Sequence, residues 1–399
     1  MIIQRPTLQE DLQSAKWLLV YGRRKTGKTF LVSEFMDYDS FYFVKRDRTI
    51  ITKDDWRTID QGTLLELVRR DLSDDKTVVI DEFHRLGKEI LDVIHSMDIR
   101  GRLVLISSTL HLSKELVSSS SRILGKVSEV RVDLISYLDI LSCVKGKGKD
   151  FYELQAFRTE PLVLALDYKN PVDMVRGSIL TVPALIGEIF SEEDRKMSGI
   201  YEGILRAIAV GKKRSGQISS YIFSRKLIKK DDPSIIQQYI VNLMDLGILK
   251  RTKVWSKKRY VYEHVSPLFK VFFALDERYN ISDRDLSRKQ LRTLIDEMIP
   301  HVMEEILRKA VSEATGTISL VDQSPDDEID GIFLKFKKPV IAMEVKWKDR
   351  IRGNEAEKIK ERLMAHDVER RILVVPDKKI VTIKGVEILE PVDILDMRS

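Results

Sequence analysis

Gly22-Arg-Arg-Lys-Thr-Gly-Lys-Thr29 is the stretch that decides the fold of the first part of the chain. Its spacing, G-x-x-x-x-G-K-[ST], is typical of a phosphate-binding loop between a strand and a helix. An apolar segment at Trp17–Tyr21 precedes it, and a helical pattern over residues 27–37 follows it. Backbone N–H groups of the loop and the helix N-terminus would hold phosphate oxygens. The predicted nucleotide contacts in this loop are Gly22, Arg23, Arg24, Lys25, Thr26, Gly27, Lys28 and Thr29.

The side chains for hydrolysis come from this loop and from a second strand. An apolar run at residues 77–80 predicts that strand, which ends in Asp81 and Glu82. Lys28 would reach the β- and γ-phosphates, and Thr29 and Asp81 would hold Mg²⁺. Glu82 is placed to orient the attacking water. We therefore expect a nucleoside triphosphate and Mg²⁺ as cofactors, with Lys28 and Glu82 as catalytic residues.

The remaining strands and helices predict a parallel sheet with crossover helices. A strand at residues 102–106 ends in Ser107-Ser-Thr109, and Thr109 either senses the γ-phosphate or belongs to a polar turn. Ligands bind at the carboxyl ends of such strands, where all these motifs lie. The other predicted elements are strands at Ser40–Val44 and 127–132, and helices at 62–72, 87–97 and 112–119.

Positive charge is concentrated in one part of the chain. The 399 residues carry a net charge of +6, but residues 199–262 hold 14 Lys/Arg and 4 Asp/Glu, so this block is +10 and the rest is −4. Such a block predicts a polyanionic partner. The single cysteine excludes an internal disulfide framework. No apolar run approaches 18 residues and no signal-peptide pattern is present, so we expect a cytoplasmic protein without a membrane partner.

The basic block has the pattern of three helices followed by a hairpin. The third helix has Asp232 as its N-cap, Pro233 at its first position and Gly247 as its stop. A β-hairpin is predicted around Trp255-Ser-Lys-Lys258. This order resembles a winged helix, whose third helix enters the DNA major groove. A protein dock or an intramolecular switch is the alternative role.

If the block binds DNA, two groups of side chains would make the contacts. Glutamine can pair with adenine through two hydrogen bonds, and basic side chains meet phosphates. Bases would be contacted by Ser234, Gln237 and Gln238, and phosphates by Lys257, Lys258 and Arg259 with Lys212, Lys213 and Arg214.

Residues 300–399 place three carboxylates and a lysine on an α-β-β-β-α-β pattern. Glu304 falls on the helix, Asp330 on the second strand, and Glu344 and Lys346 on the third. Glu344 and Lys346 are two positions apart and so share a face of the strand. Carboxylate oxygens suit Mg²⁺, so Glu304, Asp330 and Glu344 are candidate metal ligands, and Asp330, Glu344 and Lys346 candidate catalytic residues. A surface ion pair is the alternative. The predicted elements are helices at 300–313 and 354–364 and strands at 318–321, 328–336, 340–347 and 371–375.

The phosphate loop, Asp81-Glu-Phe-His-Arg-Leu86 and Ile106-Ser-Ser-Thr109 resemble the archaeal ATPase family, a branch of the signal-transduction (STAND) P-loop ATPases related to AAA+ proteins. Ala156-Phe-Arg-Thr-Glu-Pro-Leu-Val163 resembles its lid motif, with Arg158 and Thr159 in place of two glycines. Gly125-Lys126 matches a Gly-Arg of the family, and nearby Arg122 is a candidate arginine finger. The resemblance implies ATP as the nucleotide, a winged helix and a C-terminal PD-(D/E)xK nuclease-like domain.

The expected fold is α/β and multidomain. It comprises a P-loop parallel-sheet ATPase core (1–148), a helical lid (149–198), a winged helix (199–265) and an α/β restriction-endonuclease-like domain with linking helices (266–399). The leading hypothesis is an ATPase that hydrolyses ATP, binds DNA through the winged helix and carries a nuclease-like domain. The alternatives are an ATP-regulated, Mg²⁺-dependent DNA nuclease and a STAND-type signalling switch whose winged helix docks protein. Assembly into a homo-oligomer stays open.

Overall fold

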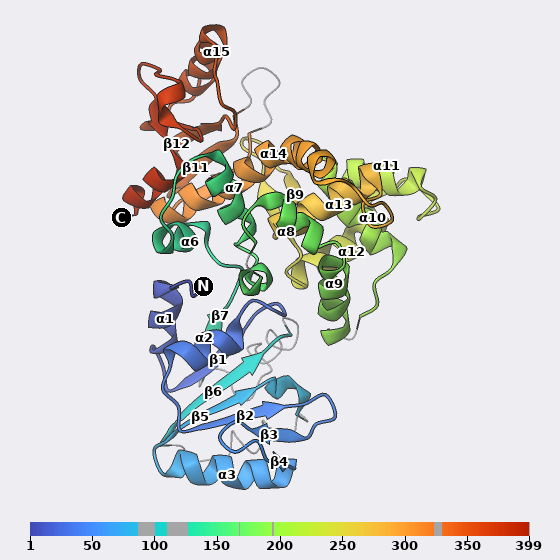
Figure 1. The fold of residues 1–399 in the computed structure, drawn as a ribbon, viewed down its shortest axis with the longest axis vertical. Helices are drawn as coiled ribbons and strands as arrows, with labels where there is room; N and C mark the ends of the chain where they lie inside the picture. Colours follow the sequence, from blue (N-terminus) through green and yellow to red (C-terminus); the bar gives the residue numbers. More distant parts are fainter. Residues whose placement is uncertain (87–99, 110–126, 167, 194, 323–328, 399) are drawn as a thin grey trace.

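The computed structural model describes residues 1–86, 100–109, 127–166, 168–193, 195–322 and 329–398. The first part of the chain forms the seven-stranded sheet at the bottom of Figure 1, with strand order β4-β3-β2-β5-β6-β1-β7. The five strands β2, β5, β6, β1 and β7 run parallel, and β3 and β4 add an antiparallel edge. The strands are β1 (Trp17–Tyr21), β2 (Ser40–Val44), β3 (Ile50–Thr52), β4 (Thr58–Ile59), β5 (Thr77–Asp81), β6 (Arg102–Ser107) and β7 (Ser128–Arg131).

Helices cover both faces of this sheet because its strands are apolar on both sides. Leu18 and Val20 of β1 pack with α1 (Pro6–Leu12) and α2 (Lys28–Phe35), whereas Leu19 packs with α3 (Gln61–Ser73). Continuous apolar strands of this kind are typical of parallel sheets covered on two sides. The strands and the two helices predicted here are confirmed, and the β3–β4 edge is an addition. The helices predicted at 87–97 and 112–119 lie outside the described residues.

A helical region follows, seen in green to orange in Figure 1. Its first helices extend from the end of the sheet, and three further helices and a hairpin occupy the basic block. Among the described residues no single helix has the length and apolar composition to cross a bilayer, and only the pair α8 and α9, bent by 55°, meets both criteria together. The elements are α6 (Tyr137–Cys143), α7 (Lys149–Phe157), α8 (Pro171–Gly177), α9 (Thr181–Glu192), α10 (Gly199–Ala209), α11 (Ser215–Ser224), α12 (Pro233–Asp245), β8 (Leu249–Lys253) and β9 (Tyr260–His264).

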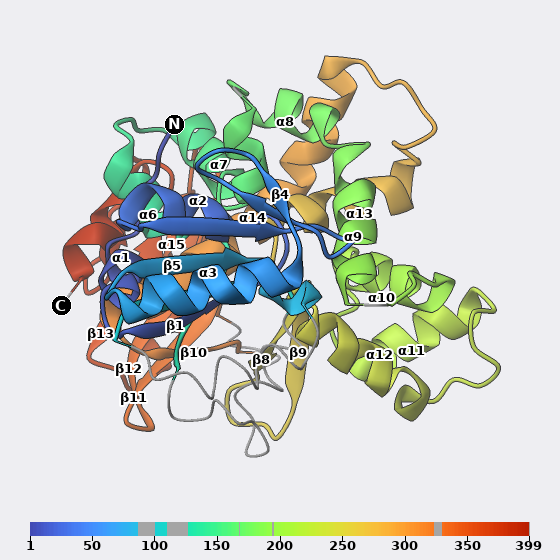
Figure 2. The same ribbon diagram turned by 90° about the horizontal axis from the view of Figure 1, so that it is seen from below.

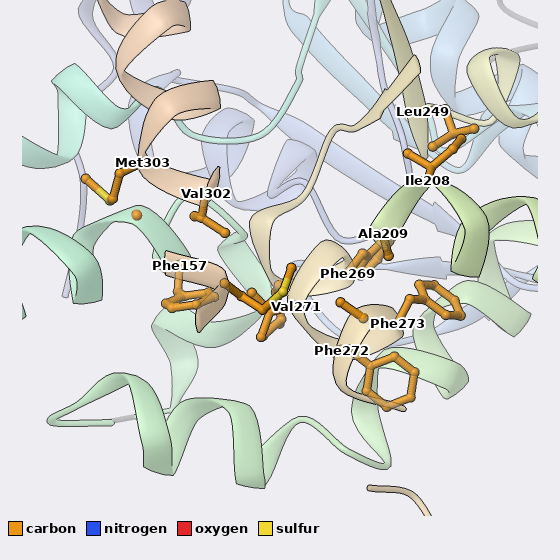
Figure 3. Close-up of a cluster of buried hydrophobic side chains, with 14 of the residues drawn as sticks. Phe157, Ile208, Ala209, Leu249, Phe269, Val271, Phe272, Phe273, Val302 and Met303 are labelled. Carbon is orange, nitrogen blue, oxygen red and sulfur yellow. The ribbon is translucent and has the colours of Figure 1, made fainter. Parts of the chain in front are cut away.

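One hydrophobic core joins the helical region to the C-terminal sheet. Figure 3 shows part of it, with Phe157 of α7 close to Val271 of α13 (Pro267–Tyr279) and Val302 of α14 (Arg288–Thr315). The same core contains buried residues of α9, α10 and α12 and of the C-terminal strands. The segments predicted as lid, winged helix and linking helices therefore share their packing.

The C-terminal sheet, red in Figure 1, has five strands in the order β10-β11-β12-β13-β14. Alternate residues of its strands face opposite sides, so Met343 packs in the core with α14 and Ala342 packs with α15 (Gly353–Met364). The predicted order of elements is confirmed here, with β14 added. The strands are β10 (Ile318–Leu320), β11 (Gly331–Lys335), β12 (Lys338–Val345), β13 (Arg370–Val374) and β14 (Glu387–Leu389).

Helix α14 corrects one predicted boundary. The sequence predicts a helix from Pro300, since proline favours a first turn, but α14 begins at Arg288 and contains Pro300 in its interior. Its true start is a capping box, in which the Ser287 hydroxyl accepts from the N–H of Gln290 and the Gln290 side chain accepts from the N–H of Ser287.

Candidate nucleotide site and carboxylate cluster

The phosphate loop (residues 22–29) follows β1 and ends in the first turn of α2. Gly22 lies against the residue that follows β7, since a Cβ atom on Gly22 would stand 2.1 Å from the carbonyl oxygen of Val132. Gly27 has φ of +88°, a left-handed conformation that glycine adopts without steric cost. Both glycines are therefore required by the shape of the loop.

Lys28 is folded over the centre of this loop. Its Nζ donates hydrogen bonds to the carbonyl oxygens of Gly22 and Arg23, both at 3.0 Å. Burial lowers the pKa of Lys28 to about 8, and the charges of Glu82 and Asp81 partly oppose that shift. The ammonium group thus lacks a buried anionic hydrogen-bond partner in the loop, and a phosphate oxygen would supply one.

The ends of three neighbouring elements bring together the residues that the sequence predicts for hydrolysis. The Thr29 hydroxyl donates to Asp81 Oδ2 at 2.7 Å, and the Ser108 hydroxyl donates to Glu82 Oε2 at 2.6 Å. Burial raises the pKa of Asp81 to about 6, with the Thr29 hydrogen bond acting in the opposite direction. Thr109, the predicted phosphate sensor, is buried with its Oγ1 3.0 Å from Ser107 Oγ. Ser108 rather than Thr109 thus contacts Glu82.

The two loop arginines direct their side chains towards the helical region. Arg23 forms an ion pair with Glu160 at 2.5 Å, and its guanidinium lies 5.0 Å from the ring centre of Phe269. Arg24 pairs with Glu188 at 2.7 Å and with Glu192 at 3.0 Å, both on α9. The sequence predicts Arg23 and Arg24 as nucleotide contacts through the loop, and their side chains join the loop to the helical region. Arg122, Gly125 and Lys126 lie outside the described residues.

An apolar cavity of about 500 Å³ adjoins the phosphate loop. Sequence reasoning missed it because its lining comes from four separate segments of the chain. Lys25, Thr26 and Gly27 form its floor, and Arg5 borders it. The apolar walls include Ile2, Ile3, Phe30, Leu162 and Leu164.

The carboxylate cluster (Glu304, Asp330, Glu344 and Lys346) forms where α14 meets the C-terminal sheet. Lys346 Nζ donates to Glu344 Oε1 at 2.5 Å, while Glu344 Oε2 is buried and has no hydrogen-bond partner among the described residues. Asp330 Oδ2 accepts from the N–H of Val345 at 2.7 Å. Burial, then the charges of Glu344 and Glu304, raise the pKa of Asp330 well above its ordinary value. The structure thus brings the four predicted residues together.

A second cavity, of about 300 Å³, opens beside this cluster. Glu304 and Asp330 line it together with residues of α10 and β9, so the basic block forms one of its walls. Lys213, predicted as a phosphate contact, points into the protein and pairs with Glu305 at 2.6 Å and Glu263 at 3.4 Å. That prediction is therefore wrong for Lys213, since two buried carboxylates hold its charge.

The predicted DNA-contact side chains lie on α12 and in the wing (residues 254–259). Ser234, Gln237 and Gln238 are exposed, on the side of α12 opposite the buried Ile236 and Ile240. The Ser234 hydroxyl donates to Asp232 at 2.8 Å, as part of the helix cap. In the wing, Lys258 is exposed and Lys257 and Arg259 are half-buried.

The base of the wing is attached to the C-terminal sheet. The N–H of Trp255 donates to the carbonyl of Val321 at 2.8 Å, and the N–H of Val321 donates to the carbonyl of Lys253 at 3.1 Å. These bonds join the end of β10 to the end of β8. The hairpin is therefore attached to the C-terminal sheet.

A family model described as an AAA domain matches residues 14–141. The seven-stranded, mostly parallel sheet formed by this part of the chain fits the P-loop ATPase core that the sequence predicts. No curated protein matched the sequence.

Several solved structures are similar to this chain. One is a Walker-type ATPase of Pyrococcus abyssi, at 18% identity and TM-score 0.45, covering 68% of this chain and 96% of that one. The ORC2 protein of Aeropyrum pernix is 12% identical, with TM-score 0.37 and 74% and 93% covered. A STAND protein with a tetratricopeptide repeat sensor from Pyrococcus horikoshii is 12% identical, with TM-score 0.27 and 78% and 48% covered.

Proposed function

We propose that the protein binds and hydrolyses ATP at the phosphate loop. The contact between Thr29 and Asp81, at 2.7 Å, carries this proposal. A hydroxyl and a carboxylate oxygen side by side, next to the lysine of the loop, are the donor set that suits Mg²⁺ bound to a nucleotide. When bound, Mg²⁺ would neutralise charge on the phosphates. Lys28 would hold the phosphate oxygens, and Glu82, oriented by Ser108, would accept a hydrogen bond from the attacking water.

The cavity beside the loop suits the base of the nucleotide. Its walls are mostly apolar, and binding sites for small molecules combine such walls with a few polar groups. Phe30 offers an aromatic face at the start of α2, and Ile2 and Leu162 offer aliphatic contacts. ATP is the nucleotide we propose, because the motifs resemble those of the archaeal ATPase family and the sequence has no guanine-reading Asn-Lys-x-Asp segment.

A substitution of Lys28 tests the proposal. Lys28→Ala should abolish ATP turnover, because it removes the ammonium group that would hold the phosphate oxygens. Lys16→Ala, at an exposed site bonded to the carbonyl of Arg100, is the control and should turn over ATP like the wild type. Full activity of Lys28→Ala would overturn the assignment.

We further propose that α12 and the wing bind DNA in the manner of a winged helix. The support is the charge of +10 over residues 199–262 together with the exposure of Gln237, Gln238 and Lys258. The buried face of α12 holds it against α10 and α11, so its polar face is left for a partner.

DNA affinity measured against salt concentration tests this interface. Three phosphate contacts would contribute about 3 to the slope of log affinity against log salt, at about 0.9 for each contact on duplex DNA. Lys257, Lys258 and Arg259 changed together to Glu should lower affinity and flatten this slope. Arg46→Glu with Arg48→Glu, on an exposed turn of the AAA domain, is the control. An unchanged slope in the triple variant would contradict DNA binding by the wing.

Mg²⁺-dependent DNA cleavage by the carboxylate cluster is a second candidate function. The buried Glu344 Oε2, which has no hydrogen-bond partner in the described part of the chain, favours it, since a divalent cation would satisfy this oxygen and separate the charges of Asp330 and Glu344. Cleavage of single-stranded, duplex and branched DNA should then need Mg²⁺ and be lost in Asp330→Ala/Glu344→Ala. Cleavage by that variant at the wild-type level would contradict a nuclease function of the carboxylate cluster.

A STAND-type switch would differ from the DNA-associated ATPase and from the DNA nuclease in its response to DNA. The ion pairs of Arg23 and Arg24 with the lid support coupling between the phosphate loop and the helical region. DNA that speeds ATP turnover would support the DNA-associated ATPase. ATP turnover unaffected by DNA, with no DNA binding at low salt, would favour the switch.

A further inference from the structure

The turn between β11 and β12 presents an unusual set of side chains to solvent. It reads Lys335-Phe-Lys-Lys338, and all four residues are exposed. Phe336 is 91% exposed, more than any other large apolar side chain in the described residues. No ion pair involving Lys335, Lys337 or Lys338 occurs within the described part of the chain.

The backbone of this turn is strained, because its two central residues are not of the types that favour its conformation. Phe336 and Lys337 have φ of 49° and 71°, so both central residues of the two-residue turn are left-handed. Such turns strongly favour Asn-Gly or Gly-Gly, because a bulky side chain is sterically disfavoured at positive φ. Packing does not explain the phenylalanine, since its ring is almost wholly in solvent. Strained residues of this kind gather at binding sites.

The turn lies on the same sheet as the carboxylate cluster. Asp330 precedes β11 and Lys335 ends it, five positions away, or about 17 Å at about 3.4 Å per residue. Leu334 packs in the same apolar cluster as Ile332, and it pairs with the 68% exposed Ile318 of β10. The turn reaches the outer edge of the ribbon in Figure 2. A bound single strand of a few nucleotides would span the distance between the turn and the carboxylate cluster.

We propose that the β11–β12 turn is a contact for single-stranded nucleic acid, in which Phe336 stacks on an unpaired base and Lys335, Lys337 and Lys338 bind phosphates. This inference rests on the proposed DNA binding and adds a second surface to it. An aromatic ring among unpaired cations is the combination that binds single strands without sequence preference. The strained turn holds the ring away from the sheet, where a base can reach it.

Fluorescence anisotropy with labelled oligo-dT of 20 nucleotides and with a covalently closed duplex circle as competitor tests the proposal. Phe336→Ala should weaken oligo-dT binding about tenfold, and Phe336→Trp should restore it. Trp56→Ala, which removes another exposed aromatic residue at positive φ, is the matched control and should bind like the wild type. Lys335, Lys337 and Lys338 changed together to Gln should reduce the salt slope by about 2, at about 0.7 for each contact on a single strand.

A turn variant separates loss of binding from loss of folding. Phe336→Asn with Lys337→Gly installs the favoured turn, so the hairpin should be at least as stable while oligo-dT binding still falls. Wild-type protein that binds neither oligo-dT nor duplex would overturn the proposed DNA binding itself. Wild type that binds duplex alone, or Phe336→Ala that binds oligo-dT equally well, would overturn only this inference. If Phe336→Ala loses binding to phosphatidylserine vesicles but keeps its binding to oligo-dT, the turn is a membrane contact, and this inference is overturned too.

Discussion

Arg23 of the phosphate loop and Glu160 of the segment after α7 form an ion pair of 2.5 Å whose side chains are 4% and 0% exposed. The two residues are 137 positions apart. The pair makes the phosphate loop continuous with the core of the helical region, because Arg23 also lies over Phe269 of α13. A displacement of Arg23 would therefore act directly on this core.

Breaking this buried pair should destabilise the protein. Glu160→Gln leaves the Arg23 guanidinium buried with a neutral partner, and the loss of one member of a buried ion pair costs about 3–5 kcal/mol. Glu188→Gln breaks a pair of the same loop whose carboxylate is 45% exposed, and should cost at most about 1 kcal/mol. Urea unfolding of both variants measures the difference. Equal unfolding free energies would contradict the structural role of Glu160.

Glu82 should affect hydrolysis without affecting nucleotide binding. Glu82→Gln keeps the size of the side chain but removes the charge that polarises water, so turnover should fall about 100-fold to 10,000-fold. Binding of a fluorescent ATP analogue should stay at the wild-type level. Glu129→Gln, on an exposed carboxylate that accepts from Tyr21, is the control for both measurements. Turnover of Glu82→Gln close to the wild type would place the catalytic group elsewhere.

The carboxylate cluster should respond to Mg²⁺ in the absence of nucleotide. A cation bound only by the folded state stabilises it by about 2.7 kcal/mol at 100 times its dissociation constant. Mg²⁺ should therefore raise the unfolding temperature of the wild type and of Asp81→Asn, but not of Glu344→Gln. Thermal unfolding with Mg²⁺ and with EDTA makes the comparison. A Mg²⁺ shift that survives in Glu344→Gln would show that the cation binds at another place.

His264 should make stability depend on pH. Burial lowers its pKa to about 4, with the hydrogen bond to the carbonyl of Leu205 opposing, and Glu305, Lys270 and Lys213 are the charged groups around it. The folded protein keeps the neutral ring, so the unfolded chain binds the extra proton below its pKa of about 6.5. The stabilisation is complete above pH 6.5 and decreases as pH falls to 4, by about 3 kcal/mol. His264→Gln should flatten this dependence in urea unfolding measured between pH 4 and 7. If the stability of His264→Gln depends on pH as steeply as that of the wild type, other groups cause the pH dependence.

The wing is attached to the C-terminal sheet and does not project freely into solvent. The sequence could not reveal this attachment. The three helices and the hairpin follow from apolar periodicity and from the cap at Asp232. The bonds between Trp255 and Val321 join segments that are far apart in the sequence, and no local pattern marks them. Lys213 shows the same limit, because a lysine in a basic turn resembles a surface cation until Glu263 and Glu305 are brought to it.

The sequence by itself determined the phosphate loop, the strands that end in Asp81 and Ser107, and the alternation that places Glu344 and Lys346 on one face. These features depend on residues within a few positions of one another, so backbone geometry and period are sufficient to predict them. The tertiary structure decided the partners of Arg23, the cavity beside the loop and the approach of Glu304 to Asp330. Each of these joins segments more than 20 residues apart, and their meeting depends on how the helices and sheets pack as a whole.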